Sequence, residues 1–208
     1  DLKSLLTLQE RFQASQFEIF LFIMNTLIYK TTMEREIVLG FANSLRTLKT
    51  INTVGCFANT LPFFTKYDPE LTIEDFFRKI KDNLAQARKY GSVPFERIVD
   101  HLKVERSEAK TPIFQILLVM DSNLIQDKGF NHTKEEESEV LAKYDQTWYF
   151  RRTKENFEVV LEYCTDLYYE STIEYMLEKF VFLLNFIAEN LQMELKDICL
   201  LTCQEKNE

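Results

Sequence analysis

One polar pair interrupts an otherwise apolar, strand-like run at residues 54–64, VGCFANTLPFF. The pair is Asn59 and Thr60. Asn is disfavoured in strands, and a buried amide costs free energy unless its donors and acceptors are paired. Asn59 is therefore predicted either to brace a neighbouring loop or to face a polar cavity.

Apolar residues at helical spacing predict two helices near the start of the chain. The first is short and amphipathic and covers residues 2–8. The second covers residues 17–28 after a Ser15 cap and is apolar on nearly every side. Such a helix is normally buried on more than one face, so it is expected at the centre of the fold, between a sheet and other helices.

Three more helices are predicted further along. Thr72 opens a capping-box pattern, and the helix that follows ends at Gly91. Pro94 suits the first turn of the next helix. Its inward-facing residues are expected to be Phe95, Ile98, Val99 and Leu102. Ser171 and Glu174 form a capping-box pattern at the start of a long final helix.

Strand patterns alternate with these helices. They cover residues 36–42, 54–64, 112–121, 144–152 and 157–165. The last two flank a turn and predict a hairpin, while residues 43–52 and the acidic segment 121–142 are predicted to be polar loops. No repeat or low-complexity linker divides the chain. The prediction is one α/β domain, a layered α+β sandwich in which helices pack on a sheet.

Composition excludes several classes of function. The net charge of −8 opposes nucleic-acid binding, which needs clustered Lys and Arg. The four cysteines form no C-x-x-C pair, so we expect no metal site, reduced thiols and a cytoplasmic setting. The longest apolar stretch, residues 17–29, contains Glu18 and is too short to span a bilayer.

Four motifs follow one another at domain-scale spacing. They are the run at 54–64, VPFER at 93–97, KTPIFQ at 110–115 and LEYCTDLY at 161–168. This series resembles the C-terminal half of a nonribosomal peptide synthetase condensation domain, with motifs close to (I/V)GxFVNTLPxR, (H/N)QDxPFE, RDxSRxPLFQ and LEYxTDLF. The resemblance covers nearly the whole chain. It implies a chloramphenicol-acetyltransferase-like half-domain with a mixed sheet, one arm of a V that encloses a substrate tunnel.

The catalytic signature of that family, HHxxxDG, belongs to its N-terminal half and is absent from this sequence. The only histidines are His101 and His132, and neither lies beside another His or precedes Asp-Gly. The resemblance therefore implies no catalytic residue in these 208 residues. Asp100 and His101, neighbours on a predicted helix, point in different directions and do not form a catalytic pair.

The resemblance implies two groups of functional residues. The group expected near the substrate tunnel is Asn59, Thr60, Gly55, Ser44 and Arg46. The group expected to hold the motifs in place is Pro94, Phe95, Glu96, Arg106 and Pro112. Bracing remains the alternative for Asn59, and a solvated loop the alternative for Ser44 and Arg46. Gly55 is expected to permit close approach of the backbone, and Glu96 to pair with Arg97 or Arg106.

The implied function is amide-bond formation between aminoacyl or peptidyl thioesters on carrier proteins. The partners would be a peptidyl carrier protein bearing a phosphopantetheine thioester, and the N-terminal half; no cofactor is expected on this chain. An exposed aromatic patch at Trp148 would favour a homodimer or another partner. A trimeric acetyltransferase is disfavoured because its chemistry needs an HxxxDG-like histidine.

The sequence departs from the family pattern at three places. Phe64 replaces an Arg, residues 90–92 replace the (H/N)QD run, and Ser107 stands where an Asp is expected. These departures favour an alternative, in which the chain is a catalytically inactive module that keeps the fold and binds a carrier protein or another part of a synthetase.

Overall fold

The computed structural model describes residues 2–50, 52–55, 57–104, 111–121, 142–152 and 156–201. Its helices are α1 (Leu2–Phe12), α2 (Gln16–Thr32), α3 (Ile73–Lys89), α4 (Phe95–Leu102) and α5 (Glu170–Glu189), followed by a short 3-10 helix at Leu195–Asp197. Its strands are β1 (Glu36–Ser44), β2 (Ala58–Lys66), β3 (Ile116–Asp121), β4 (Gln146–Arg152) and β5 (Phe157–Tyr163). Helices and strands thus alternate as the sequence predicts.

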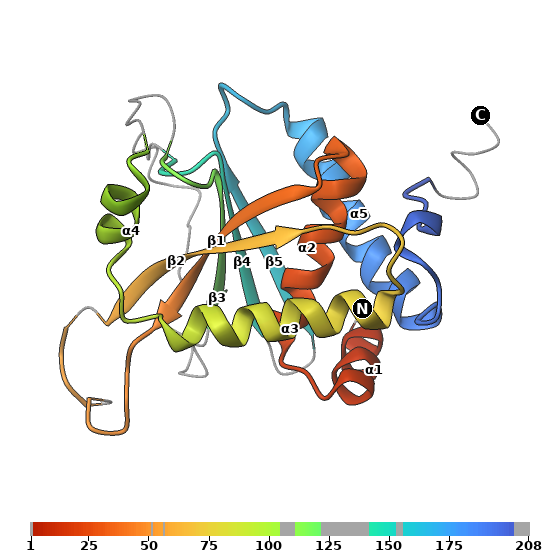
Figure 1. The fold of residues 1–208 in the computed structure, drawn as a ribbon. Coiled ribbons are helices and arrows are strands. Elements are labelled where there is room, and N and C mark those ends of the chain that lie inside the picture. The colour runs from red at the N-terminus through yellow and green to blue at the C-terminus, as the bar shows by residue number, and fades with distance from the viewer. Residues whose placement is uncertain are drawn as a thin grey trace.

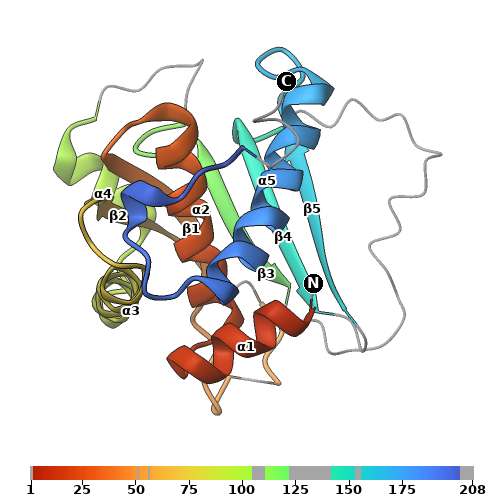
Figure 2. The same ribbon diagram turned by 90° about the vertical axis from the view of Figure 1, so that its right-hand side faces the viewer.

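The described strands form one five-stranded sheet in the order β2-β1-β3-β4-β5. The outer pairs, β1 with β2 and β4 with β5, are antiparallel, whereas β3 runs parallel to both of its neighbours. Helices α2 and α5 lie together on one face of this sheet, and α4 lies on the other side (Figure 1, Figure 2). The predicted α/β fold with a mixed sheet packed by helices is confirmed.

The main core lies between the sheet and the helices. On β1, Ile37, Leu39 and Phe41 face it, and on β2 their neighbours Phe63 and Leu61 do the same. Thirteen residues of α2 between Gln16 and Tyr29 are buried, as expected for a helix that is apolar all round. The predicted Ser15 cap is confirmed, because its hydroxyl accepts a hydrogen bond from the Glu18 backbone in a reciprocal capping box.

A smaller apolar cluster occupies the opposite face of the sheet and joins α4 to β3 and to the segment before β4. It contains Phe114, Leu117 and Tyr144, and Phe95 packs against it. The Phe114 ring lies 5.4 Å from the Phe95 ring and 5.5 Å from the Tyr144 ring, centroid to centroid. This cluster fixes the start of α4 relative to the sheet.

A tight turn places the Phe114 side chain in that cluster. Ile113 has a φ of 75°, and the Phe114 backbone N–H donates to the Pro112 carbonyl at 3.0 Å. This is a three-residue γ-type turn, which is costly for a β-branched residue. Because of this turn, residues 112–115 are not part of the strand. The prediction of a strand over 112–121 was therefore wrong in its first four residues, and β3 begins at Ile116.

Four other predictions need correction. Trp148 is 0% exposed, because it packs on Phe180 and its indole N–H donates to the Gln146 side chain at 2.9 Å, so the aromatic patch predicted at Trp148 does not exist. Ser171 does not cap α5, which starts at Glu170 after Tyr169 without a side-chain cap. Leu102, predicted to face inward, is 56% exposed. The strand predicted to start at residue 54 starts only at Ala58, the first residue of β2.

Gly40 provides a test of the smaller cluster. A β-carbon there would lie 2.1 Å from the Phe114 ring, so Gly40→Ala must push that ring off β1. We expect the free energy of unfolding to fall by about 1–3 kcal/mol in urea denaturation. Gly40→Ala combined with Phe114→Leu should lose less than the two separate losses added together. Unchanged stability of Gly40→Ala would contradict this packing.

Candidate functional site

Asn59 braces the turn between α3 and α4. Its amide nitrogen donates to the Gly91 carbonyl at 2.9 Å and to the Val93 carbonyl at 2.7 Å. The turn closes on itself through a hydrogen bond from the Val93 N–H to the Tyr90 carbonyl. One side chain at the start of β2 thus uses both of its amide hydrogens to hold a segment more than thirty residues away. Of the two roles predicted for Asn59, the structure shows the brace directly.

Two neighbours shape the space around this brace. Asn43 is the cross-strand partner of Asn59, and its side-chain nitrogen would lie 2.7 Å from a β-carbon at Gly91. The Arg88 carbonyl would lie 3.0 Å from the same β-carbon. A side chain at Gly91 would therefore force the Asn43 amide to move and crowd the Arg88 carbonyl. Asn43, expected in a loop, instead extends β1 beside Asn59.

Arg46 organises the loop between β1 and β2. Its guanidinium donates to the carbonyls of Thr50 at 3.0 Å, Thr53 at 2.9 Å and Gly55 at 3.2 Å. It also lies 4.6 Å from the centre of the Phe57 ring, a cation–π contact. The planar five-donor fork of Arg suits this task, because it reaches several carbonyls at once. These hydrogen bonds tie Arg46 to carbonyls of its own loop.

The other predicted tunnel residues lie at the same end of the sheet. Ser44 is the last residue of β1, and its hydroxyl accepts from the Arg46 N–H at 3.3 Å. Thr60 pairs with Ala42 and points to the face opposite Asn59, because side chains alternate along β2. Gly55 has a φ of 157°, a backbone conformation that L side chains rarely adopt, and a β-carbon added there would lie 3.4 Å from the Phe57 ring, in ordinary contact.

The second predicted group is only partly within the described residues. Pro94 is the N-cap of α4, one position earlier than expected. Phe95 joins the smaller cluster, and Glu96 lies in the first turn of α4, where a carboxylate complements the helix dipole. Pro112 accepts the hydrogen bond of the tight turn before β3. Arg106, His132, Ser107 and the acidic run 135–137 lie outside the described residues.

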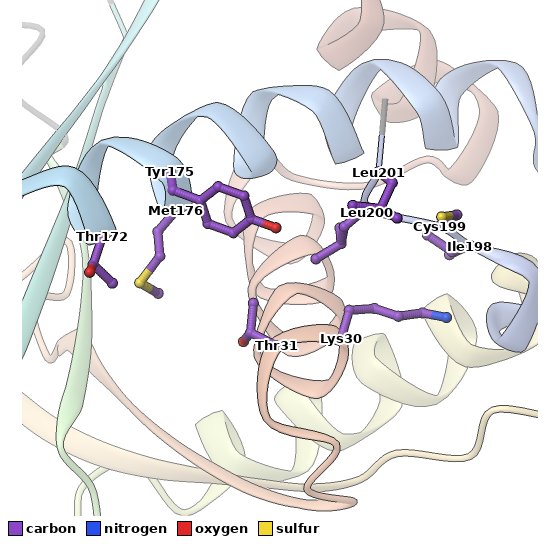
Figure 3. Close-up of a pocket in the computed structure, with 9 residues that line it drawn as sticks. All are labelled: Lys30, Thr31, Thr172, Tyr175, Met176, Ile198, Cys199, Leu200 and Leu201. Atoms are coloured by element: carbon purple, nitrogen blue, oxygen red, sulfur yellow. The ribbon is translucent and has the colours of Figure 1, made fainter. Parts of the chain in front are cut away.

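The sequence did not predict a hollow on the surface of the protein. A hollow of about 540 Å³ lies between the end of α2, the first half of α5 and residues 198–201 (Figure 3). Met176 and Leu200 supply apolar lining, and Lys30 stands at its edge, donating to the Lys196 carbonyl at 3.0 Å. Burial lowers the pKa of Lys30. Three segments that are far apart in the sequence line this hollow, so no local sequence motif could predict it.

His101 is exposed on α4, and among the described residues no group of three His, Cys, Asp or Glu side chains is arranged to hold a metal ion. The thiols of Cys164 and Cys199 are free. No helix in the described ranges is long and apolar enough to cross a membrane.

Comparison with known proteins gives a consistent match. The family model described as the condensation domain matches residues 1–208. Tyrocidine synthase 2 of Brevibacillus parabrevis is 28% identical over 211 residues, covering 100% of this chain and 6% of that protein. Gramicidin S synthase 2 of Brevibacillus brevis is 28% identical over 202 residues, covering 92% of this chain and 4% of that protein. The chain thus spans only a small part of these relatives.

Solved structures share the fold. The four-domain nonribosomal peptide synthetase holo-AB3403, bound to AMP and glycine, superposes with a TM-score of 0.84 at 18% identity, over 98% of this chain and 17% of that one. The first condensation domain of the calcium-dependent antibiotic synthetase, in complex with a substrate analogue, gives 0.77 at 15% identity, over 96% of this chain and 44% of that one. At such identities the likeness concerns the fold alone.

The Asn59 brace can be tested by substitution. Asn59→Ala removes two hydrogen bonds, and we expect the free energy of unfolding to fall by about 1–3 kcal/mol. Asn59→Asp should do no better, because a carboxylate cannot donate to the two carbonyls. The control is Asn52→Ala, an exposed amide of the β1–β2 loop, which should stay within about 0.5 kcal/mol. An Asn59→Ala protein as stable as this control would refute the brace.

The Arg46 contacts predict a local effect on the β1–β2 loop. Arg46→Lys keeps the charge but replaces the planar fork with a single ammonium. We expect amide hydrogen exchange at Thr50 and Thr53, whose N–H groups close the turns of this loop, to become about tenfold faster while the sheet is unaffected. Lys49→Ala is the control on the same loop. Equal exchange in all three proteins would contradict the organising role of Arg46.

Proposed function

The chain belongs to the condensation-domain family, and we propose that it is the C-terminal subdomain of a nonribosomal peptide synthetase condensation domain. The observation that carries this proposal is a family match over residues 1–208 in a sequence that has the four C-terminal-half motifs and no HHxxxDG. Coverage of 44% of a solved condensation domain fits one half of such a domain.

The proposed reaction joins two carrier-bound groups. The acceptor amine attacks the carbonyl carbon of a thioester, a carbon–nitrogen bond forms, the carbon–sulfur bond breaks, and the phosphopantetheine thiol leaves with the proton. The second His of HHxxxDG, on the N-terminal half, would assist this proton transfer, and a positioned acid–base group of this kind contributes on the order of 10²–10⁴ in rate. In a chloramphenicol-acetyltransferase-like V, this chain supplies one wall of the tunnel.

In this proposal the tunnel residues act indirectly. Asn59 fixes the turn that leads into Pro94 and Phe95, and Arg46 fixes the loop that leads into β2. Both act on the end of the sheet where Ser44, Gly55 and Thr60 also lie. In the proposal these residues set the shape of the tunnel wall, and the setting of the whole enzyme is cytoplasmic.

A second candidate follows from the departures from the family pattern. Phe64, where the motif has an Arg, is exposed on β2, and the (H/N)QD run is replaced at Tyr90, Gly91 and Ser92. These changes favour a catalytically inactive module that binds a carrier protein or another synthetase part, alone or as a homodimer.

A reconstitution experiment distinguishes the half-domain from the inactive module. The chain is mixed with a separately expressed N-terminal half that carries HHxxxDG, and amide product from two carrier-bound substrates is measured by mass spectrometry. We expect product from the mixture and none from this chain alone. The control replaces the second His of the other half with Ala, which should lower the rate by about 10²–10⁴.

Product formed by these 208 residues alone would overturn the half-domain proposal. A mixture that binds both carriers and forms no product would favour the inactive module.

A further inference from the structure

The hollow beside the end of α2 brings two nucleophilic side chains together. Lys30 comes from the last turn of α2 and Cys199 from the segment after the 3-10 helix, and both line the same hollow of about 540 Å³. Both residues are half-buried, and the Cys199 thiol is free. Figure 3 draws these two side chains at one end of the hollow and Thr172 and Met176 at the other. An amine and a thiol that share a cavity are a candidate site for covalent chemistry.

The Lys30 amine is held in place and is partly withdrawn from water. Its Nζ donates to the Lys196 carbonyl at 3.0 Å, which ties α2 to the segment that carries Cys199. Burial lowers the pKa of Lys30, and the charges of Cys199 and Asp197 oppose this shift. The Cys199 sulfur is thus near enough for its charge to act on the amine. A lowered pKa leaves more of a lysine in its neutral, nucleophilic form.

The rest of the hollow is lined mainly by apolar side chains. Met176, Ile198 and Leu200 are buried residues of this lining. A cavity of this size and character suits a small ligand with an apolar chain and one polar, reactive group. The chain of such a ligand would lie toward Met176, and its reactive group toward Lys30 and Cys199.

We propose that this hollow binds a medium-chain acyl thioester and that the acyl group passes to Lys30 by way of Cys199. An acyl thioester combines an apolar chain with a carbonyl carbon that thiolates and amines attack, so it fits both parts of the lining. The product is a stable amide on Lys30. This modification needs neither a carrier domain nor another half-domain, so it is separate from the proposed condensation reaction.

Two transfers make up the modification. The Cys199 sulfur attacks, as the thiolate, the carbonyl carbon of the bound thioester. A new carbon–sulfur bond forms, the original one breaks, and the leaving thiolate takes up the proton that Cys199 gave up. The neutral Lys30 amine then attacks the same carbon. A carbon–nitrogen bond forms, the bond to Cys199 breaks, and one amine proton goes to the Cys199 sulfur, which restores the thiol. Because both groups line one hollow, the second transfer is intramolecular and therefore favoured over attack by a lysine elsewhere.

The test uses the 208-residue chain alone. The chain is incubated at neutral pH with octanoyl-N-acetylcysteamine, a small acyl thioester, and acylated peptides are located by mass spectrometry. We expect a hydroxylamine-stable octanoyl amide to form on Lys30 about tenfold or more faster than on Lys49, an exposed lysine outside the hollow. The acetyl thioester should show a smaller preference for Lys30, because it has little apolar surface to bury.

Three variants assign the two transfers to their residues. Cys199→Ser should remove the preference for Lys30. Cys164→Ser is the matched control and should keep it, since Cys164 is also free and half-buried but lies just after β5, outside the hollow. Lys30→Arg should leave on Cys199 an octanoyl group that hydroxylamine removes, because the second transfer is blocked.

Acylation of Lys30 no faster than that of Lys49 would overturn the inference, and so would a Cys199→Ser protein that keeps the preference. Equal labelling of Cys164 and Cys199 in the Lys30→Arg protein would overturn it as well, because exposure of a thiol would then be enough. Urea denaturation shows whether each variant is folded. If Cys199→Ser is unstable, the Lys30→Arg protein decides, since it keeps the thiol.

Discussion

The structure depends on the burial of α2. A helix that is apolar on every side has no face for water, so it must be enclosed by several elements at once. Phe20 meets Phe150 of β4 at 4.5 Å and Phe180 of α5 at 5.7 Å, centroid to centroid. Phe22 meets both Phe76 and Phe77 of α3. The sheet, α5 and α3 are therefore placed relative to one another through this one helix.

The buried polar groups of α2 fit the same account. Asn25 and Thr26, both fully buried, donate to the carbonyls of Leu21 and Phe22 one helical turn before them. Their hydrogen-bonding needs are thus partly met inside the helix, and α2 can be surrounded by apolar side chains. The sheet in turn can leave its other face to the smaller Phe114 cluster, which positions α4.

Local signals were sufficient for most of the elements. Ser15 and Glu18 predict the start of α2, and Thr72 predicts the start of α3, because both caps depend on residues three positions apart. The turn at Ile113 could not be foreseen, since it is stabilised by packing of Phe114 on Gly40, far away in sequence. Trp148 was misplaced for the same reason, because α5 covers it and nothing in β4 says so.

The candidate site likewise has residues that could be predicted from the sequence and contacts that could not. An unusual Asn in a strand identified Asn59, whereas Ser44 and Arg46 were named only because the family resemblance places them near the tunnel. The carbonyl partners of Asn59 and Arg46 could not be predicted, because a backbone carbonyl has no sequence signature. The exposure of Leu48 and Val54 could not be predicted either, because in the sequence they look like ordinary apolar residues.

The central claim is that this chain is half of a larger domain. The most direct measurement is the molar mass of the purified chain by light scattering over a concentration series, with and without an N-terminal half that carries HHxxxDG. The account predicts a complex of one copy of each half. A stable dimer of this chain that ignores the other half would contradict it.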